Sequence, residues 1–430
     1  MKIGIDISPL QTNHRMRGIG AVTFNLINNL PQQSKDEHEF VFYADPGEKS
    51  LGLALRMLNL DDLNYEVRYK PVVKAIQKYR LPGKLKIISK LIKKLRSAIR
   101  FRVGQSGYDY SELDVFLLID PTLTMPRMPG VEKFMIAYDL IPYIIEWDYL
   151  HSYKTVRDKG LGRKAALAAQ LQRNVYISKI RSNVKKSVQV IAISEQTKAD
   201  FVKYARAPLK KIKTIPLGVN APLSEALEKE PNKHYVETSW GYVTRKIKFD
   251  NSTPYILFLG GTDARRKIND LVTAFNHLRA EGHKLNLVLS GDILEGAQCL
   301  PVKDTREALS LSSYKDDIIY LGFTDEPTKA WLYRHALAFV YPSRYEGFGL
   351  PVLEAMSYST PVIAYENGAL QEIADKSVVF AKDALGIKDA ILEIIEHPDI
   401  AQKRSTAGIK TTEKYTWQKT ADQIIKTLTT

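Results

Sequence analysis

The sequence predicts an α/β fold of two doubly wound domains that face each other across a cleft. Short apolar strand candidates alternate with helical patterns, which is the rhythm of a parallel sheet covered by helices. These candidates fall into two series, separated by a mixed polar stretch at residues 220–253. The chain has 430 residues, 44% of them apolar and 26% charged, so it can bury two sizeable cores. This composition excludes a disordered chain and a small disulfide-stapled domain.

The first series predicts a domain over residues 1–220. It opens with a short alternating strand at Lys2–Ile7, followed by an amphipathic run at Val22–Leu30 and a second strand at Glu39–Tyr43. Four further strand candidates follow, at Leu113–Ile119, Lys133–Tyr138, Val188–Ile193 and Thr214–Leu217. Strand, turn, helix and strand in this order indicate a parallel sheet.

The second series predicts a domain over residues 254–414. Its strand candidates are Tyr255–Leu259, Leu285–Leu289, Ile318–Leu321, Ala338–Tyr341, Pro361–Ala364 and Ser377–Phe380. Helical patterns such as Asp270–Ala280 and Thr328–Ala336 lie between them. We interpret residues 221–253 as an interdomain connection with some irregular structure. Residues 415–430 read as a closing amphipathic helix.

One segment carries almost all of the net charge. The formal charge of the chain is +14, and residues 67–104 hold thirteen Lys and Arg residues and no Asp or Glu, which leaves about +1 for the rest. On a helical wheel, Lys84–Arg102 places its Leu, Ile and Ala residues on one side and its basic residues on the other. The basic side holds Lys86, Lys90, Lys93, Lys94, Arg96 and Arg100. This pattern is typical of a helix that lies in an anionic membrane surface.

Two other interpretations of this basic segment stay open. The helix could pack its apolar side on the sheet and leave its basic side solvated. It could also bind nucleic acid, although aromatic residues are sparse in it. We expect membrane contact and no nucleic acid.

We expect a cytoplasmic protein, bound peripherally to the inner face of a membrane. The start of the chain lacks the long apolar block of a secretion signal. No stretch reaches the roughly 18 uninterrupted apolar residues of a spanning helix. The single cysteine, Cys299, has no partner in the chain, which argues for a reducing compartment.

The most informative stretch is residues 341–354, with the sequence YPSRYEGFGLPVLE. A strand ends at its first residue, a loop follows, and a proline occupies the favoured first turn of a helix. Gly347 and Gly349 let the backbone approach a ligand closely, and a helix start offers free N–H groups to a phosphate. Glu346 before the helix and Glu354 one turn inside it can contact two parts of one molecule. A sugar nucleotide, with hydroxyl groups at both ends and phosphates between, fits this arrangement. The alternative, that both glutamates are plain surface carboxylates near a helix start, explains the surrounding loop less well.

A second phosphate-binding element is predicted where the strand Tyr255–Leu259 runs into Gly260 and Gly261. Three cations follow before the next helix: Arg265, Arg266 and Lys267. Alone, a glycine pair beside basic residues is more typical of a solvated turn. Together with the loop that carries Glu346 (residues 342–350, the glutamate loop), it forms a second clamp for a diphosphate.

These motifs resemble those of the retaining glycosyltransferases with the GT-B fold, in the large GT4-type group that includes bacterial polysaccharide mannosyl- and rhamnosyltransferases. Glu346 and Glu354 match the glutamate pair, separated by seven residues, that marks this group. The match continues through Thr360–Ala364 and Gly368–Glu372, and it also covers the region from Gly260 to Lys267 and the turn Leu321–Phe323. In the first half of the chain it includes Arg17–Gly20, Tyr138–Pro142, Ser194 with Thr197, and Pro216–Gly218. The resemblance is dense over residues 255–372 and sparse before them. It implies two Rossmann-like domains, with the donor bound in the second and the acceptor in the first.

The resemblance also implies an activity. A retaining hexosyltransferase would move mannose, rhamnose, glucose or a similar hexose from a GDP-, UDP- or dTDP-linked donor. The acceptor would be a glycan or a lipid-linked molecule in surface polysaccharide or glycolipid synthesis. No cofactor besides the nucleotide sugar is implied.

Particular residues would carry this reaction if the resemblance holds. Glu346 would contact the hydroxyl groups of the donor sugar, and Glu354 the ribose. An Arg-Lys pair of the family would neutralise the leaving diphosphate. A gapless alignment places that pair on Arg265 and Arg266, and a shift by one residue places it on Arg266 and Lys267. The other donor-binding positions are Gly18, Gly20, Gly261, Phe348, Gly349 and Leu350.

Two positions depart from the family pattern. Tyr138 stands where many relatives have histidine, and Ala21 stands where relatives often have arginine. Asp139 is the nearby candidate for a catalytic base, and capping the turn into Pro142 is its structural alternative. Retention needs no base if a phosphate oxygen of the leaving diphosphate takes the acceptor proton. For Gly18 and Gly20 a plain tight turn stays open, and Ser194 and Thr197 read as a helix start.

We predict no metal ion. The sequence has no Asp-x-Asp pair, and its eight histidines are scattered without the spacing of metal ligands. Cations and helix termini would stabilise the leaving group instead.

Two other classes of function stay open at this point. An NAD-dependent oxidoreductase could use a doubly wound fold, but no Gly-x-Gly-x-x-Gly follows the first strand. A non-catalytic protein that binds a sugar nucleotide or a membrane is the other alternative.

Overall fold

The structure is a computed structural model of the chain. It describes residues 1–430 apart from 13–14, 16–17, 72–106, 221, 223–234, 241–242, 249–251, 292–302 and 323. The predicted membrane residues Lys86, Lys90, Lys93, Lys94, Arg96 and Arg100 lie outside the described residues, as do Arg17, Cys299 and Phe323. In the described part of the chain, no helix has the length and apolar character needed to cross a bilayer.

The first domain is built on a seven-stranded parallel sheet with the order β3-β2-β1-β4-β5-β6-β7. Its strands are β1 (Lys2–Asp6), β2 (Glu39–Ala44), β3 (Tyr65–Tyr69), β4 (Val115–Leu118), β5 (Glu132–Ala137), β6 (Gln189–Ala192) and β7 (Ile212–Thr214). The central strands read as continuous apolar runs because helices bury both faces of a parallel sheet. Strand β7 begins two residues before the predicted Thr214–Leu217 and shares only Thr214 with it.

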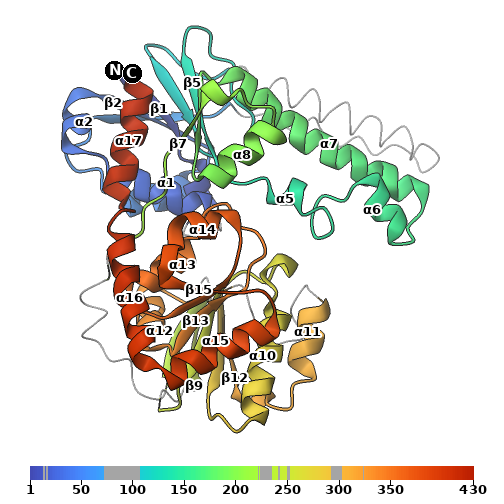
Figure 1. Cartoon of the computed structure of the whole chain (residues 1–430). Coiled ribbons are helices and arrows are strands. Elements are labelled where there is room, and N and C mark those ends of the chain that lie inside the picture. The colour runs from blue at the N-terminus through green and yellow to red at the C-terminus, as the bar shows by residue number, and fades with distance from the viewer. Residues whose placement is uncertain are drawn as a thin grey trace.

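Helices cover both faces of this sheet, and one of them reaches well beyond it. They are η1 (Ser8–Gln11), α1 (Ile19–Asn28), α2 (Gln32–Glu37), α3 (Glu48–Met57), α5 (Ile141–Ile144), α6 (Tyr153–Asp158), α7 (Arg163–Lys186), α8 (Glu195–Lys203) and η3 (Leu209–Lys211). Figure 1 shows α7, with α6 packed at its far end, projecting away from the body of the domain.

The second domain is built on a six-stranded parallel sheet with the order β12-β11-β10-β13-β14-β15. Its strands are β10 (Tyr255–Gly260), β11 (Asn286–Gly291), β12 (Ile318–Gly322), β13 (Ala338–Tyr341), β14 (Val362–Tyr365) and β15 (Val378–Ala381). Its helices are η4 (Ala264–Arg266), α10 (Ile268–Ala280), α11 (Lys303–Ser310), η6 (Lys315–Asp317), α12 (Glu326–His335), α13 (Leu350–Ser357), α14 (Gly368–Ala374), η7 (Asp375–Ser377), α15 (Ala384–Glu396) and α16 (Pro398–Thr412). The predicted fold class, two doubly wound parallel domains, is confirmed.

The stretch between the domains contains regular structure that the sequence did not suggest. Strands β8 (Tyr235–Trp240) and β9 (Val243–Lys248) pair antiparallel as a two-stranded sheet. The irregular structure expected here is therefore wrong for these residues. Their Val, Thr, Tyr and Trp content favours strands, but the charges interspersed among them gave no apolar run to recognise.

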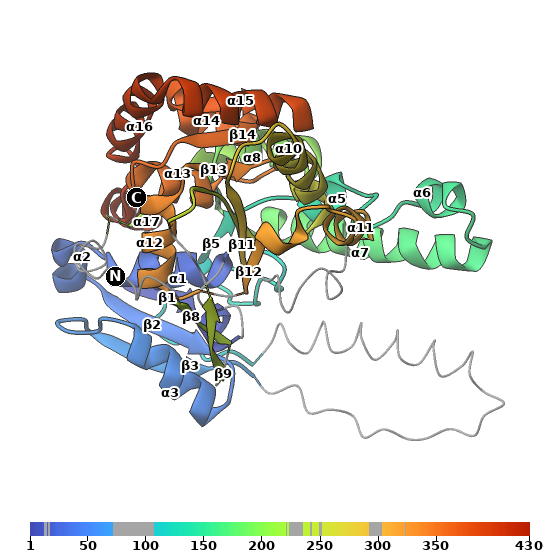
Figure 2. The same cartoon turned by 90° about the horizontal axis from the view of Figure 1, so that it is seen from below.

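The end of the chain returns to the first domain. Helix α16 leads into α17 (Trp417–Thr429), which lies against α1 (Figure 1 and Figure 2). Thr420 Oγ1 donates to the carbonyl of Pro216 over 2.8 Å, and Lys213 Nζ lies 3.0 Å from Thr427 Oγ1. Gly218 packs so closely on this crossing that a Cβ there would lie 2.2 Å from the nitrogen of Trp417. The domains are thus joined at two places in the chain.

Candidate active site

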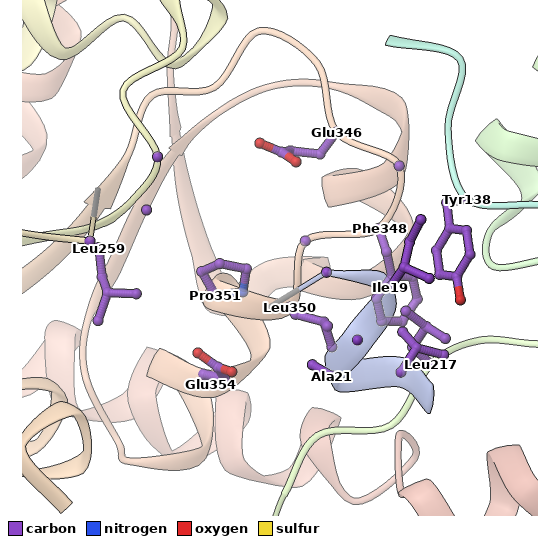
Figure 3. A pocket seen from close by; sticks show the side chains of 18 of the residues that line it. Ile19, Ala21, Tyr138, Leu217, Leu259, Glu346, Phe348, Leu350, Pro351 and Glu354 are labelled. Atoms are coloured by element: carbon purple, nitrogen blue, oxygen red, sulfur yellow. The ribbon is translucent and has the colours of Figure 1, made fainter. Parts of the chain in front are cut away.

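A cavity of about 700 Å³ lies between the two domains. Its walls follow the carboxyl ends of strands from both sheets, which is where open α/β sheets bind ligands. The first domain contributes Pro9, Thr12, Gly18, Ile19, Gly20, Ala21, Val22, Asp120, Tyr138, Asp139, Ile193 and Leu217. The second domain contributes the ends of β10, β11 and β13, the start of α12 and the loop into α13. Figure 3 shows Glu346 and Glu354 on opposite sides of the start of α13, with Leu350 and Pro351 between them.

Glu346 is held in a buried cluster of hydrogen bonds and opposite charges. Its side chain accepts from Tyr341 OH over 2.8 Å and forms an ion pair with Arg265 Nη1. Arg266 Nε lies 3.6 Å from the same carboxylate oxygen. Glu346 is only 8% exposed. A buried carboxylate needs such partners because it has lost its hydration.

The charges of this cluster decide its ionisation. Burial opposes ionisation of Glu346, but the guanidinium groups of Arg265 and Arg266 outweigh it and hold the pKa of the carboxyl below its ordinary value. Burial likewise disfavours the charged form of Arg265, and the negative charge of Glu346 raises the pKa of this guanidinium in spite of it. Glu346 is therefore an anion and Arg265 a cation throughout the physiological pH range.

The three predicted cations take different places. Arg265 is 6% exposed and also donates to Ser343 Oγ and the carbonyl of Tyr345, so it fixes the glutamate loop. Arg266 lines the cavity, and its Nε is buried without a hydrogen-bond partner in the described part of the chain. Lys267 starts α10 in the left-handed region, with φ of 43°, and does not line the cavity.

The loop into α13 presents a row of free amides. Within the described residues, the N–H groups of Gly347, Phe348 and Gly349 have no acceptor. Gly349 has φ of 114°, and a Cβ there would lie 2.3 Å from Leu370 Cδ2, so only glycine fits. Leu350 then opens α13. Free amides at a helix start form a site suited to an anion such as phosphate.

Glu354 marks the other end of this row. Its carboxylate lies 3.2 Å from Lys329 Nζ and accepts from Tyr333 OH over 3.1 Å. Lys329 also pairs with Glu326 over 2.8 Å. The side chain of Glu354 is 26% exposed, so part of it remains open to the cavity.

Tyr138 and Asp139 form the opposite wall. Asp139 accepts from the N–H of Ile141 over 3.0 Å, as a turn cap does, and it also lines the cavity. Burial raises the pKa of this carboxyl, and the amide of Ile141 and the charge of Arg265 counteract the rise only in part. Tyr138 is 8% exposed, and its hydroxyl is buried without a partner in the described part of the chain.

Gly18 and Gly20 bring the start of α1 to the cavity. Gly18 has φ of 49° and precedes the helix. A Cβ on Gly20 would lie 2.4 Å from the carbonyl oxygen of Arg15. Both glycines line the cavity together with Gly261 from the second domain.

Sequence reasoning missed several residues of the second-domain wall. Ser290, Gly291, Thr324 and Lys329 all line the cavity. Ser290 and Gly291 end β11, and a small residue followed by glycine after a buried strand is a signal that could have identified them. Thr324 and Lys329 carry no comparable signal.

Comparison with known proteins gives the class. Residues 243–411 match the family described as glycosyl transferases group 1. O-antigen chain mannosyltransferase B of Escherichia coli is 31% identical over 180 residues, which is 40% of this chain and 44% of that enzyme. An uncharacterized glycosyltransferase of Methanocaldococcus jannaschii is 25% identical over 315 residues, 69% of this chain and 75% of that protein.

Solved structures share the fold over the whole chain. Anabaena HepE, in complex with UDP and glucose, has a TM-score of 0.60 at 14% identity, covering 100% of this chain and 99% of that one. WaaG, a glycosyltransferase involved in lipopolysaccharide biosynthesis, has a TM-score of 0.58 at 12% identity, with both chains covered completely.

Two parallel-sheet domains with a cavity between them define a protein of the GT-B fold. The second domain of this chain is similar to the group 1 glycosyl transferases, whose family pattern matches residues 243–411. That similarity argues against an NAD-dependent oxidoreductase.

Proposed function

We propose that the chain is a metal-independent, retaining hexosyltransferase. It moves a hexose from a nucleoside-diphosphate sugar to a glycan or lipid-linked acceptor in the synthesis of a surface polysaccharide or glycolipid. One observation carries this proposal: the Glu346 carboxylate is kept ionised between two guanidinium groups, in a cavity that also holds Glu354 beyond the start of α13.

The groups along the cavity complement a sugar nucleotide. Glu346 accepts hydrogen bonds from hydroxyls of the hexose, and Glu354 accepts them from the ribose. The free amides of residues 347–349, which stand in the chain between Glu346 and Glu354, bind the phosphates. Polar ends and an anionic middle thus each meet a partner of the right character.

The proposed reaction occurs on one face of the sugar. The acceptor oxygen bonds to the anomeric carbon while the bond from that carbon to the phosphate oxygen breaks. Because attack and departure share one face, the configuration is retained. The acceptor proton passes to an oxygen of the leaving phosphate, so no separate base is needed. Arg266 and the α13 amides stabilise the charge on the leaving diphosphate. Asp139, whose pKa burial raises, is the second candidate for accepting the proton.

The named relatives suggest the first donors to test. One is a mannosyltransferase, and another structure contains UDP and glucose. We would therefore offer GDP-mannose, UDP-glucose and dTDP-rhamnose, with octyl glycosides as soluble acceptors and EDTA present. Proton NMR of the product gives the anomeric configuration. One donor should be consumed with retention. Inversion, or loss of turnover in EDTA, would contradict the corresponding part of the proposal, and binding without turnover would favour a non-catalytic binding protein.

We also propose peripheral association with an anionic membrane, on the sequence pattern of Lys84–Arg102 alone. Replacement of Lys86, Lys90, Lys93 and Lys94 by serine should weaken co-sedimentation with vesicles of phosphatidylglycerol and phosphatidylcholine. Each basic residue near such a surface contributes about 1 kcal/mol. Unchanged sedimentation would remove this part of the proposal.

A further inference from the structure

The glutamate loop of the second domain is held from the first domain. Ser194 Oγ donates to the carbonyl of Gly347 over 2.7 Å, and Thr197 Oγ1 lies 3.1 Å from the same oxygen. Ser194 and Thr197 are each 1% exposed, at the start of α8. Gly347 has no room for a side chain, because a Cβ would lie 2.9 Å from Asp139 Cβ. The two domains therefore touch directly behind the cavity.

The two hydroxyls do not contribute equally. Thr197 Oγ1 lies within hydrogen-bonding distance of two carbonyls, those of Tyr138 and Gly347. Because the hydroxyl carries one hydrogen, it shares that hydrogen between them. Ser194 Oγ accepts from the N–H of Thr197 over 2.9 Å, so its own hydrogen is available for Gly347. Ser194 is the principal donor to this carbonyl.

The second domain holds α8 in return. Glu372 on α14 accepts from the N–H groups of Glu195 and Gln196, over 2.8 and 2.6 Å. These amides belong to the first turn of α8, where they have no acceptor within the helix, and a carboxylate also suits the positive end of the helix dipole. Tyr345 OH also donates to Asp200 of α8. Helices α8 and α14 lie side by side at the domain boundary (Figure 1).

The carbonyl of Gly347 and the N–H of Phe348 belong to one peptide group. In a trans peptide they point in opposite directions, so fixing the carbonyl fixes the amide. That amide has no acceptor in the described part of the chain, and Phe348 lines the cavity. A hydroxyl of the first domain thereby sets the direction of a phosphate-binding amide in the second.

We propose that Ser194, assisted by Thr197, is a positioning residue that orients the Gly347–Phe348 peptide from across the domain boundary. The amide row then binds a diphosphate fully only when the domains are closed. By linkage, a diphosphate in the cavity favours closure by the same free energy. This inference rests on the proposed function for the identity of the ligand, and on the contacts of Ser194 for the rest.

The test compares Ser194→Ala with Ser194→Thr, which keeps a hydroxyl, by calorimetric titration with UDP, GDP and dTDP. Loss of one hydrogen bond should weaken diphosphate binding about three- to tenfold in the alanine variant. The threonine variant should retain most of the affinity. Since Ser194 also caps α8, Asp383→Ala is the control: it removes the same kind of cap from α15, away from the cavity. It should lose similar stability and keep the wild-type affinity.

Hydrogen exchange of the amides of residues 345–350, measured without ligand, tests independently whether Ser194 holds the glutamate loop. Exchange should be faster in Ser194→Ala than in the wild type, Ser194→Thr or Asp383→Ala. If exchange and affinity both match the wild type, Ser194 is only a helix cap and the inference is wrong. If the wild type binds none of the diphosphates, the proposed function fails, while the exchange comparison still decides whether Ser194 holds the loop.

Discussion

Glu346 and Glu354 come from one short stretch of sequence but meet different surroundings. Glu346 is buried against Arg265 and Arg266, whereas Glu354 pairs with Lys329 and stays partly exposed. The sequence pattern predicted the two carboxylates and the cations near them. It could not predict which of the cations pairs with Glu346, because that depends on which side chain reaches the carboxylate once the loop after β10 and the glutamate loop fold together.

Replacing Glu346 tests the residue that carries the proposal. Glu346→Ala should abolish transfer, because it removes the carboxylate that we propose contacts the sugar. It should also lower the free energy of unfolding by about 3 kcal/mol, since two guanidinium groups stay buried without their counterion. Chemical denaturation and the transfer assay measure the two effects. Glu366→Gln, an exposed carboxylate in the loop before α14, is the matched control. Full activity of Glu346→Ala would refute the assigned role.

The ionisation of Glu346 gives a pH prediction. Its pKa lies below the ordinary value because of the two guanidinium groups, so a step that needs the anion should persist below about pH 4.3. Removing one positive charge raises the pKa, so in Arg266→Gln the acid limb of kcat/KM should move to higher pH. An unshifted limb, alongside reduced activity, would mean that Glu346 does not govern it.

The buried hydroxyl of Tyr138 leads to a prediction about the stability of the free protein and about its KM. Its hydroxyl is buried without a partner in the described part of the chain, a state that costs about 1–3 kcal/mol. Tyr138→Phe should therefore be at least as stable as the wild type in thermal denaturation. Because Tyr138 lines the cavity and its hydroxyl has no partner in the described part of the chain, loss of that hydroxyl should raise the KM for donor or acceptor. Reduced stability with unchanged KM would contradict this account.

Secondary structure elements were predictable to the extent that they are buried. Strands such as β10 and β13 are continuous apolar runs, and the sequence located them closely. Strand β3 went unrecognised because its partly exposed residues include Glu66 and Arg68 beside aromatic residues, without an apolar run. The charged sequence of β8 and β9 hid them in the same way.

The start of α13 is the element on which the proposed donor binding depends, and a substitution of Gly349 tests this. In Gly349→Ala, the positive φ and the 2.3 Å approach to Leu370 would force the loop to move. We expect a loss of about 2 kcal/mol in stability together with weaker diphosphate binding. Gly52→Ala, inside α3 with no atom near its added Cβ, should instead be neutral or stabilising. Wild-type binding by Gly349→Ala would contradict the role given to this backbone.

At the scale of the molecule, the site is assembled from parts that are far apart in the chain. Ser194 and Gly347 are separated by 153 residues, and α17 crosses back to pack on α1. Sequence patterns predicted two domains facing across a cleft, because each sheet has its own series of apolar strands alternating with helices. No local pattern predicts a hydrogen bond across that distance, so the contacts that hold the domains together appear only in the structure.

The central claim is that the cavity binds a nucleoside diphosphate between Glu346 and Glu354. Thermal denaturation with UDP, GDP, dTDP and NAD, on the wild type and on Glu354→Ala, tests it most directly. We predict that one diphosphate stabilises the wild type without added metal and that Glu354→Ala loses most of this shift. A wild type that responds to no diphosphate would contradict the claim, and the chain would then be a GT-B protein without a working donor site.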